Sequence, residues 1–518
     1  MPESISKTHQ KKRHKKSNIP SIGQGLFVLL FISIVVYLLA RSIFIVYADY
    51  LPVEKVLAVF FLLAEMFIMF HAIGYLGTIY RLNKLGMKEE PTPQFENNAF
   101  PAVAVLIPAR HEKKEVIENT LISCHNMVYP NKTIYLLDDS SLPEFKREAE
   151  EVAKKYNVRI FRREERHGAK AGVINDCVKG LTEKYIAIFD ADQNPLPTFL
   201  NRLVPLLEKN GQLAFVQTPQ FYSNMDENRI TFAANMQQAV FYEYVCEAKS
   251  TNQAMICCGT NVVIRRDALN DVGGFDESTV TEDFATSFKF HRQGWQSRYD
   301  NQVNTYGMAP TDLAGYFTQQ NRWALGNVTV FRHVLGMMFK DPRSLSFIQW
   351  WEYIITGSYY LIGWAYMFLF LCPVAFLFFN IPSFFMNPVV YSLTFLPYFI
   401  LSMSIFYVSM LSRRVQISQL LKGQLLAVLT LPVYMRASLL GFLGVRGTFQ
   451  ITSKDSSQHH GVPYRVLWPQ LLFWALNLSA VTWGINRFVF EQTASVMINV
   501  LWAGYHCIVL SSIFYYNE

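Results

Sequence analysis

The chain has 518 residues, a formal net charge of +7 and 51% hydrophobic residues. Only 17% of its residues are charged, against roughly 25% in soluble domains, and its mean hydropathy is +0.14. This composition argues against a disordered chain, a disulfide-rich secreted domain and a wholly soluble protein. It is also too polar for a bundle made only of membrane helices. We therefore expect a soluble part and a membrane part in one chain.

The positive charge is concentrated at the N-terminus. Residues 1–20 contain one acidic residue and six basic residues, which leaves +5 of the net charge in this segment. A long apolar run follows directly and has no small-residue cleavage pattern, so we do not expect a signal peptide. We interpret residues 1–20 as a basic cytoplasmic tail and expect no nucleic-acid partner.

Six apolar segments reach the length of about 20 residues that a membrane span requires. They lie at 25–47, 56–79, 351–378, 388–411, 466–489 and 494–516. They group into pairs within 21–80, 346–415 and 463–518. Positive charge follows the second and fourth segments, at Arg81, Lys84 and Lys88 and at Arg413 and Arg414. The positive-inside rule then predicts a multi-pass protein of the cell membrane (plasma or inner), with both termini and the middle of the chain in the cytoplasm.

Two further segments read as helices that lie on the membrane surface. The segment 416–443 is apolar but contains Lys422, Pro432 and Arg436. A charge at the middle of the bilayer costs about 2.5–3.5 kcal/mol on insertion scales. We therefore predict an interfacial amphipathic helix at 416–446, and a second interfacial region at 313–345.

Residues 99–312 have the pattern of a soluble α/β domain. Strand-like runs at 102–107, 133–137, 159–161, 185–189 and 214–217 alternate with helical patterns such as 142–155 and 170–181. This alternation predicts a mainly parallel sheet.

Polar residues follow three of these strands, at the edge where such sheets bind ligands. The first strand leads into Pro108 and Glu112, and the second ends at Asp138 and Asp139. The fourth ends at Asp190-Ala191-Asp192, whose two carboxylates can share a divalent cation. The alternative interpretation of each acidic pair is a turn with a helix cap. No phosphate-binding loop of the GxxxxGK[ST] type is present, and no GxGxxG follows the first strand.

Two later motifs carry further candidate residues. Thr281-Glu282-Asp283 stands at a predicted helix start, where Asp283 is a candidate general base and Thr281 a candidate cap. Gln319 to Trp323 offers an arginine for a diphosphate and a tryptophan face for a sugar ring. The alternative there is an interfacial Trp beside a snorkelling Arg.

In this order, and inside a membrane-flanked α/β domain, the four motifs resemble those of the processive family 2 glycosyltransferases, such as cellulose, chitin and hyaluronan synthases. The resemblance covers about residues 100–460. It implies a cytosolic GT-A-like domain inserted between the second and third helices of an approximately six-helix membrane bundle. Three shorter segments (167–172, 216–219 and 258–261) also resemble family motifs. The loop at 447–462 contains Phe449-Gln450-Ile451-Thr452-Ser453-Lys454, which is similar to the FxVTxK gating loop of cellulose synthases.

The resemblance implies roles for particular residues of this sequence. The catalytic group would be Asp283, Glu282 and Asp192, and the metal ligands for Mg²⁺ or Mn²⁺ would be Asp190 and Asp192. The nucleotide would be bound by Pro108, Glu112, Asp138, Asp139, Lys170, Asp190, Gln319, Arg322, Thr452 and Lys454. The acceptor would meet Trp323, Gln217, Cys258, Gly259 and Thr260. His111 departs from the family, which commonly has Asn there, and leaves open which group contacts the uracil.

The resemblance implies an inverting transfer from a UDP-sugar, and the gating loop favours polymerisation of UDP-glucose into a β-glucan that crosses the membrane. The linkage (cellulose, mixed-linkage or β-1,3) stays open. So do three alternatives: a chitin- or hyaluronan-like synthase, a non-processive lipid glycosyltransferase, and a non-enzymatic transporter. The expected partners are the UDP-sugar, the growing polysaccharide and the lipid bilayer, with a homo-oligomer or accessory export subunits possible. We find no segment that resembles a cyclic-di-GMP-binding domain.

Overall fold

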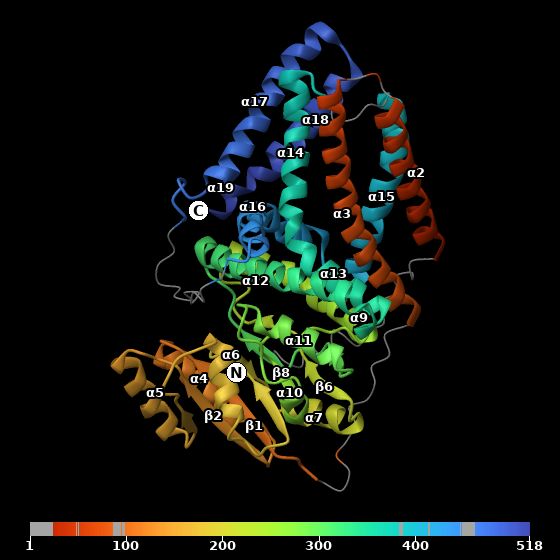
Figure 1. Ribbon diagram of the computed structural model, residues 1–518. Helices are drawn as coiled ribbons and strands as arrows, with labels where there is room; N and C mark the ends of the chain where they lie inside the picture. Colours follow the sequence, from red (N-terminus) through yellow and green to blue (C-terminus); the bar gives the residue numbers. More distant parts are fainter. Residues whose placement is uncertain are drawn as a thin grey trace.

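The computed structural model describes residues 24–47, 49, 51–85, 95, 99–382, 387–412, 415–445, 447 and 461–517. Figure 1 shows three levels: a sheet domain, a middle layer of helices, and a bundle of long helices. The sheet domain follows α3 (Pro52–Leu85) and precedes α13 (Phe347–Ser358). The domain is thus inserted after the second apolar helix and before the third apolar stretch, as the sequence predicts.

The domain is built on one seven-stranded sheet, in the order β3-β2-β1-β4-β8-β6-β9. Strands β1 to β4 run parallel, β8 is antiparallel to both β4 and β6, and β9 is parallel to β6. The strands are β1 (Val103–Ala109), β2 (Lys132–Asp138), β3 (Arg159–Phe161), β4 (Tyr185–Ile188), β6 (Leu213–Gln217), β8 (Val262–Arg265) and β9 (Gln296–Tyr299). A second sheet joins β5 (Asn194–Pro195), β10 (Thr305–Gly307) and β7 (Phe221–Tyr222). The predicted mainly parallel α/β sheet is confirmed.

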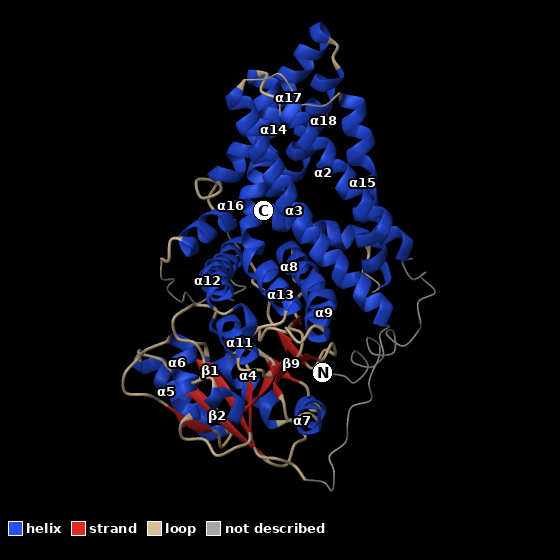
Figure 2. Cartoon of the chain, turned by 45° about the vertical axis from the view of Figure 1, so that its right-hand side comes forward, coloured by secondary structure: helices blue, strands red, loops and turns tan. Residues whose placement is uncertain are grey.

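The core explains the long apolar runs of the central strands. In β1, Val103, Val105 and Ile107 pack with the helices on one face of the sheet, and Ala104 and Leu106 pack with those on the other. Alternate residues of a strand point to opposite faces, so a strand covered on both sides is apolar throughout. The first face is covered by α4 (Lys114–His125), α5 (Pro143–Lys155) and α7 (Phe199–Lys209); the second by α6 (Ala169–Val178), α10 (Arg266–Asp271) and α11 (Glu282–Arg292). Figure 2 shows the strands enclosed by these helices.

The middle layer joins the sheet domain to the bundle. Its central element is α12 (Leu313–Lys340), which packs against α11, α13 and α16 (Ile417–Phe442). α16 also packs against α8 (Arg229–Val240), which lies at the level of α12 and α13 in Figure 2. Figure 1 shows α12 and α13 lying between the two larger parts of the molecule. This layer brings the domain's chemistry next to the membrane helices.

The bundle contains α2 (Gln24–Tyr47), α3, α14 (Ile362–Phe379), α15 (Pro388–Ser412), α17 (Trp468–Glu491), α18 (Ala494–Leu510) and the short α19 (Ser512–Tyr516). In the described chain six stretches are long and apolar enough to cross a membrane: Gly25–Tyr47, Pro52–Leu82, Phe347–Phe379, Pro388–Leu411, Ile417–Phe442 and Ala494–Tyr516. This set contains α16, which we expect at the interface, and omits α17, which we expect to span. α17 packs against α14 and α18, whereas α16 packs mainly against α12 and α8 and only in second place against α14. The interfacial position of α16 stays a prediction.

Candidate active site

The polar ends of three strands meet at one edge of the sheet. The register pairs Ala109 of β1 with Asp138 of β2, and Leu106 of β1 with Ile188 of β4. Pro108 therefore lies near the end of β1, and Asp139 and Asp190 follow the two neighbouring strands at about the same level. This edge is the place where open α/β sheets bind ligands.

Arginines hold both carboxylates at the end of β2. Arg162 donates to Asp138 Oδ2 at 2.7 Å, and Arg163 donates to both oxygens of Asp139 at 2.8 and 2.9 Å. Arg166 adds a third bond to Asp139 at 3.0 Å. We did not predict these arginines, although they follow the third strand in the sequence. Arg162 also pairs with Glu150, so three guanidinium groups hold three carboxylates and fix the positions of Asp138 and Asp139.

The segment after β1 forms the neighbouring wall. Pro108 and Glu112 are half-buried. Burial and the charges of the neighbouring arginines lower the pKa of the Arg110 guanidinium. His111 has a left-handed φ of 53°, and its backbone N–H donates to Ser140 Oγ at 3.1 Å. Burial and the charge of Arg110 lower the pKa of the His111 imidazole, which favours the neutral ring near neutral pH.

Lys170 connects the end of β4 with the loop before β8. It stands in the first turn of α6, and its Nζ donates to Asp190 Oδ1 at 2.5 Å and to the Gly259 carbonyl oxygen at 2.7 Å. Burial lowers the pKa of Lys170, but the nearby charges of Asp190 and Glu282 outweigh burial and leave the pKa raised. Lys170 is therefore a permanent cation at the centre of the acidic site.

Gln217 and Thr260 support this loop from inside the domain. The Gln217 amide donates to the Thr260 carbonyl oxygen at 2.8 Å and accepts from the Cys258 backbone N–H at 2.8 Å. Thr260 Oγ1 accepts from the Asp190 backbone N–H at 2.9 Å. Gln217 and Thr260 have no exposed surface. The geometry therefore gives them a positioning role instead of the direct acceptor contact that we predicted.

Asp283 lies at the start of α11, directly against Gly259. Gly259 has a φ of +77°, and a Cβ there would lie 3.0 Å from Asp283 Oδ2 and 3.6 Å from Lys170 Nζ. Burial and then the charge of Glu282 raise the pKa of Asp283 to about 7, although the Phe284 backbone N–H, Lys170 and Arg322 act in the opposite direction. A carboxylate with a pKa near the working pH suits a general base.

The helix α12 closes the site on the side of the membrane. A Cβ at Gly326 would lie 2.4 Å from Thr281 Cγ2, so α12 packs tightly onto the segment before Asp283. Thr281 occupies the cap position of α11, but its side chain makes no capping bond. Within the two turns before Gly326, α12 carries Gln319, Arg322 and Trp323, all half-buried. The predicted motifs at 281–283 and 319–323 thus lie on adjoining elements.

The donor atoms at the end of β4 suit a hard divalent cation. Asp190 is 41% exposed at its side chain, and Asp192 is buried. Among the described residues, no group of three or more His, Cys, Asp or Glu side chains could hold a metal. A pair of carboxylates fits Mg²⁺ or Mn²⁺, which complete their shell with water and substrate phosphates. It does not fit zinc, which takes three or four protein ligands.

The predicted gating residues Thr452 and Lys454 lie outside the described residues. The loop that contains them begins beside the site, because Gly447 is in close contact with Leu325 of α12 and with Val280. A Cβ at Gly447 would lie 2.9 Å from Leu325 Cδ2 and 3.1 Å from Val280 Cγ1.

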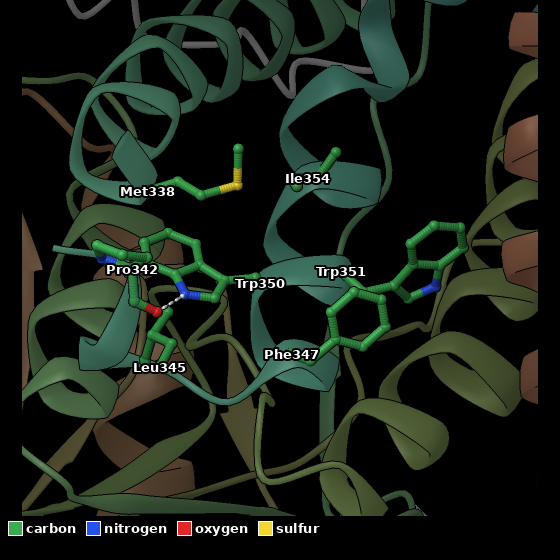
Figure 3. A pocket seen from close by; sticks show the side chains of 7 residues that line it. All are labelled: Met338, Pro342, Leu345, Phe347, Trp350, Trp351 and Ile354. Atoms are coloured by element: carbon green, nitrogen blue, oxygen red, sulfur yellow. Dashed lines mark hydrogen bonds between the residues drawn. The ribbon is translucent and has the colours of Figure 1, made fainter. Parts of the chain in front are cut away.

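An apolar pocket of about 340 Å³ lies elsewhere, between the end of α12 and α13. Figure 3 shows Trp350 and Trp351 among the side chains that line it. Trp350 is fixed by a bond from its indole N–H to the Pro342 carbonyl oxygen at 2.9 Å. The pocket contains none of the acidic or basic residues described above, so it is separate from the candidate active site.

Comparisons with known proteins agree with this geometry. Residues 101–326 match the profile of "Glycosyltransferase like family 2", and residues 270–510 match the profile "Cellulose synthase". A cellulose synthase catalytic subunit [UDP-forming] of Pseudomonas fluorescens is 26% identical over 457 residues, which cover 85% of this chain and 59% of that protein. The same subunit of Xanthomonas axonopodis pv. citri is 31% identical over 286 residues, 54% of this chain and 38% of that protein.

Among solved structures, the mannosyltransferase PcManGT from Pyrobaculum calidifontis, in complex with GDP-Man and Mn²⁺, has a TM-score of 0.51 at 17% identity. The match covers 75% of this chain and all of that chain. At this identity the likeness concerns the fold alone. The chain spans less than two thirds of the length of the curated relatives it matches. With two matching profiles that together run from residue 101 to 510, the chain belongs to the family 2 glycosyltransferases, in their cellulose synthase-like group.

Proposed function

We propose that this protein is a membrane-embedded, processive, inverting glycosyltransferase that polymerises glucose from UDP-glucose into a β-glucan and moves the product across the membrane. The names of its relatives, cellulose synthase catalytic subunits that form UDP, support this donor and product. The single observation that carries the proposal is the placement of Asp283, a half-buried carboxylate with a pKa raised to about 7, between Gly259 and α12.

Asp283 would take the proton from the attacking hydroxyl of the acceptor. Its raised pKa makes the carboxylate a stronger base than an ordinary Asp, while half of it is still ionised near pH 7. Gly259 leaves room beside Asp283 Oδ2 for the reacting groups, because no side chain stands there. Glu282 contributes by raising the pKa of its neighbour.

The donor would lie along the strand ends. Asp138, Asp139, Pro108 and Glu112 would surround the uridine. Lys170, Arg322 and Gln319 would contact the diphosphate, and their charge would stabilise the negative charge that develops on the leaving UDP. Asp190 and Asp192 would hold Mg²⁺ or Mn²⁺, which supplies further positive charge at the diphosphate when it is bound.

The acceptor would approach from the membrane side. Trp323 would stack on its terminal sugar, with Cys258 and Gly259 opposite, and Thr452 and Lys454 would close over the donor and exclude water. α12 lies between the acidic site and the bundle, so a product that leaves past Trp323 would meet the membrane helices directly. The catalytic domain and both termini would lie in the cytoplasm, and oligomers or export subunits would be additional partners.

The proposal is tested by measuring UDP or GDP release from purified full-length protein with UDP-glucose, UDP-N-acetylglucosamine, UDP-glucuronate and GDP-mannose. We expect release with UDP-glucose in Mg²⁺ or Mn²⁺ and its loss in a chelator. GDP-mannose belongs in the panel because the fold relative was solved with it. Nucleotide release from another donor alone would assign that donor, instead of UDP-glucose, as the substrate. Release from none of the four would overturn the proposal.

A further inference from the structure

His167 faces a carboxylate with each of its two ring nitrogens. Nδ1 lies 2.7 Å from Glu277 Oε2, and Nε2 lies 2.8 Å from Asp176 Oδ2. A neutral imidazole carries only one N–H, so it can donate to one of these carboxylates but not to both. The imidazolium has two N–H groups and satisfies both. The arrangement therefore fits a protonated His167.

This histidine joins two parts of the candidate active site. Asp176 belongs to α6, whose first turn carries Lys170, and Glu277 belongs to the segment that leads to Asp283. Glu277 also lies over the turn before Lys170, because a Cβ at Gly168 would be 2.2 Å from Glu277 Oε2.

The turn itself is conformationally demanding. Gly168 and Ala169 both have left-handed backbones, with φ of 57° and 47°. Ala in this region is unfavourable and needs surrounding contacts to hold it. Lys170 follows directly, and its bonds to Asp190 and Gly259 depend on the course of this turn.

We propose that His167 is a positioning residue for the donor: its imidazolium ties the turn before Lys170 to Glu277, and loss of its proton at higher pH loosens the donor site. This inference rests on the proposed function, because it assigns the donor phosphates to Lys170.

Glu277 and Asp176 raise the affinity of His167 for the proton, and two further cations lie nearby. His167 has a further charged neighbour besides its two carboxylate partners. Arg163 donates to the His167 carbonyl oxygen and lies 3.9 Å from Asp176. Lys179 donates to Asp176 Oδ1 at 2.8 Å, so Asp176 has a second cation. Glu277 accepts from the neutral Asn175 amide at 2.8 Å, so His167 is the cation that we find bonded to it within the described residues.

The sign of the pH dependence follows from these bonds. The hydrogen bond with Glu277 is the main cause that raises the pKa of His167 above its ordinary value. Below the ordinary pKa of histidine, His167 is fully protonated. It loses its proton as the pH rises through its own raised pKa. Donor binding should therefore weaken as the pH rises. The effect of Asp283 has the opposite sign, because kcat needs its ionised form.

The test is the pH dependence of KM and kcat for UDP-glucose in the full-length protein, with the dissociation constant of UDP measured at the same pH values. For the wild type we expect KM and Kd to rise about three- to tenfold with pH, because one or two hydrogen bonds at an exposed site are lost. In His167→Gln both should stay at the high wild-type value at every pH, while the rise of kcat is retained.

Two further variants separate the charge from the fold. His167→Arg keeps a cation that does not titrate, so KM should stay closer to the low wild-type value at high pH. His125→Gln, an exposed histidine at the end of α4, should keep the wild-type profile. A wild-type KM and Kd independent of pH, or a pH dependence that persists in His167→Gln, would overturn the inference. Absence of turnover at every pH would instead count against the proposed function, and the UDP affinities would still decide the role of His167.

Discussion

At the scale of single residues, Asp283 would carry the central chemical step, the removal of the proton from the acceptor hydroxyl. We expect Asp283→Asn to lower polymer synthesis by about 10²–10⁴-fold, the usual contribution of a general base. UDP affinity should stay nearly unchanged, because the variant keeps the shape of the side chain. The measurements are sugar incorporation and UDP binding on the same preparation. Loss of UDP binding together with synthesis would assign Asp283 to the donor site instead.

The same residue predicts the pH dependence of turnover. The pKa of Asp283 is raised to about 7, so the ionised base becomes the main form only above that pH. We expect kcat in wild type to rise with pH through about 7 and then to level off. A kcat that is already constant between about pH 5 and 9 would show that a group with an ordinary carboxyl pKa acts as the base.

Gly259 tests the close approach to Asp283. Gly259→Ala would place a Cβ 3.0 Å from Asp283 Oδ2 and adds strain at a φ of +77°. Gly273→Ala is the matched control, because Gly273 has the same φ of +77° and nothing within 4 Å of its Cβ position. We expect both variants to lose a similar stability, of about 1–2 kcal/mol, and only Gly259→Ala to lose most of its activity. Equal activity in the two variants would contradict the role of this contact.

At the scale of single residues, sequence patterns predicted which residues lie together at the candidate active site, but not which contacts each of them makes. The acidic motifs follow strand ends, and a parallel sheet brings those ends together. The arginines that hold Asp138 and Asp139 were missed, because which side chain reaches which carboxylate depends on the course of the loop after β3. The support role of Gln217 was missed as well, because burial of a polar side chain becomes visible only when its partners are placed.

At the scale of elements, α12 joins the chemistry to the membrane. Gly326→Ala would place a Cβ 2.4 Å from Thr281 Cγ2 and push α12 away from the segment before Asp283. Overpacking of this kind costs about 1–3 kcal/mol. Gly336→Ala lies on the same helix with nothing within 4 Å, so it should gain up to about 1 kcal/mol of helix propensity. Thermal unfolding and activity of both variants test this; equal behaviour would argue against tight packing here.

A buried ion pair fixes the sheet domain to α13. Lys249 Nζ donates to Glu352 Oε2 at 2.8 Å, with 2% and 8% of the two side chains exposed. We expect Lys249→Met to destabilise the protein by about 3–5 kcal/mol, because it leaves a buried carboxylate without its cation.

The double variant Lys249→Met, Glu352→Gln removes both charges, so it should recover part of that loss. Denaturation of both variants in the same detergent gives the comparison. A double variant that is no more stable than Lys249→Met would contradict the ion-pair explanation.

The type of an element could be predicted where its hydrophobic residues follow a single clear pattern. The parallel strands β1 to β4 and the long apolar helices follow directly from their patterns. The strands β8 and β9 are not among the predicted strands. The antiparallel direction of β8 was not predictable either, because a strand buried on both faces reads the same either way. The position of α16 was also not predictable from composition, because its composition favours a membrane span whereas it packs mainly against α12 and α8.

At the scale of the whole molecule, the positive-inside rule predicts the orientation. A cysteine at Asp49, in the short link between α2 and α3, should react with a membrane-impermeant maleimide added to intact cells. A cysteine at Glu144, exposed at the start of α5, should react only after the cells are opened. The reverse pattern would place the sheet domain outside and contradict the proposed use of a cytoplasmic nucleotide sugar.

The central claim is that one chain both makes a long β-glucan and moves it across the bilayer. The most direct test reconstitutes the full-length protein in sealed vesicles, adds UDP-glucose outside, and measures product length and its resistance to an added glucanase. We predict long chains that the glucanase degrades only after detergent opens the vesicles, and no polymer from Asp283→Asn. Single sugars attached to lipid, or a polymer that is fully accessible outside, would contradict the account.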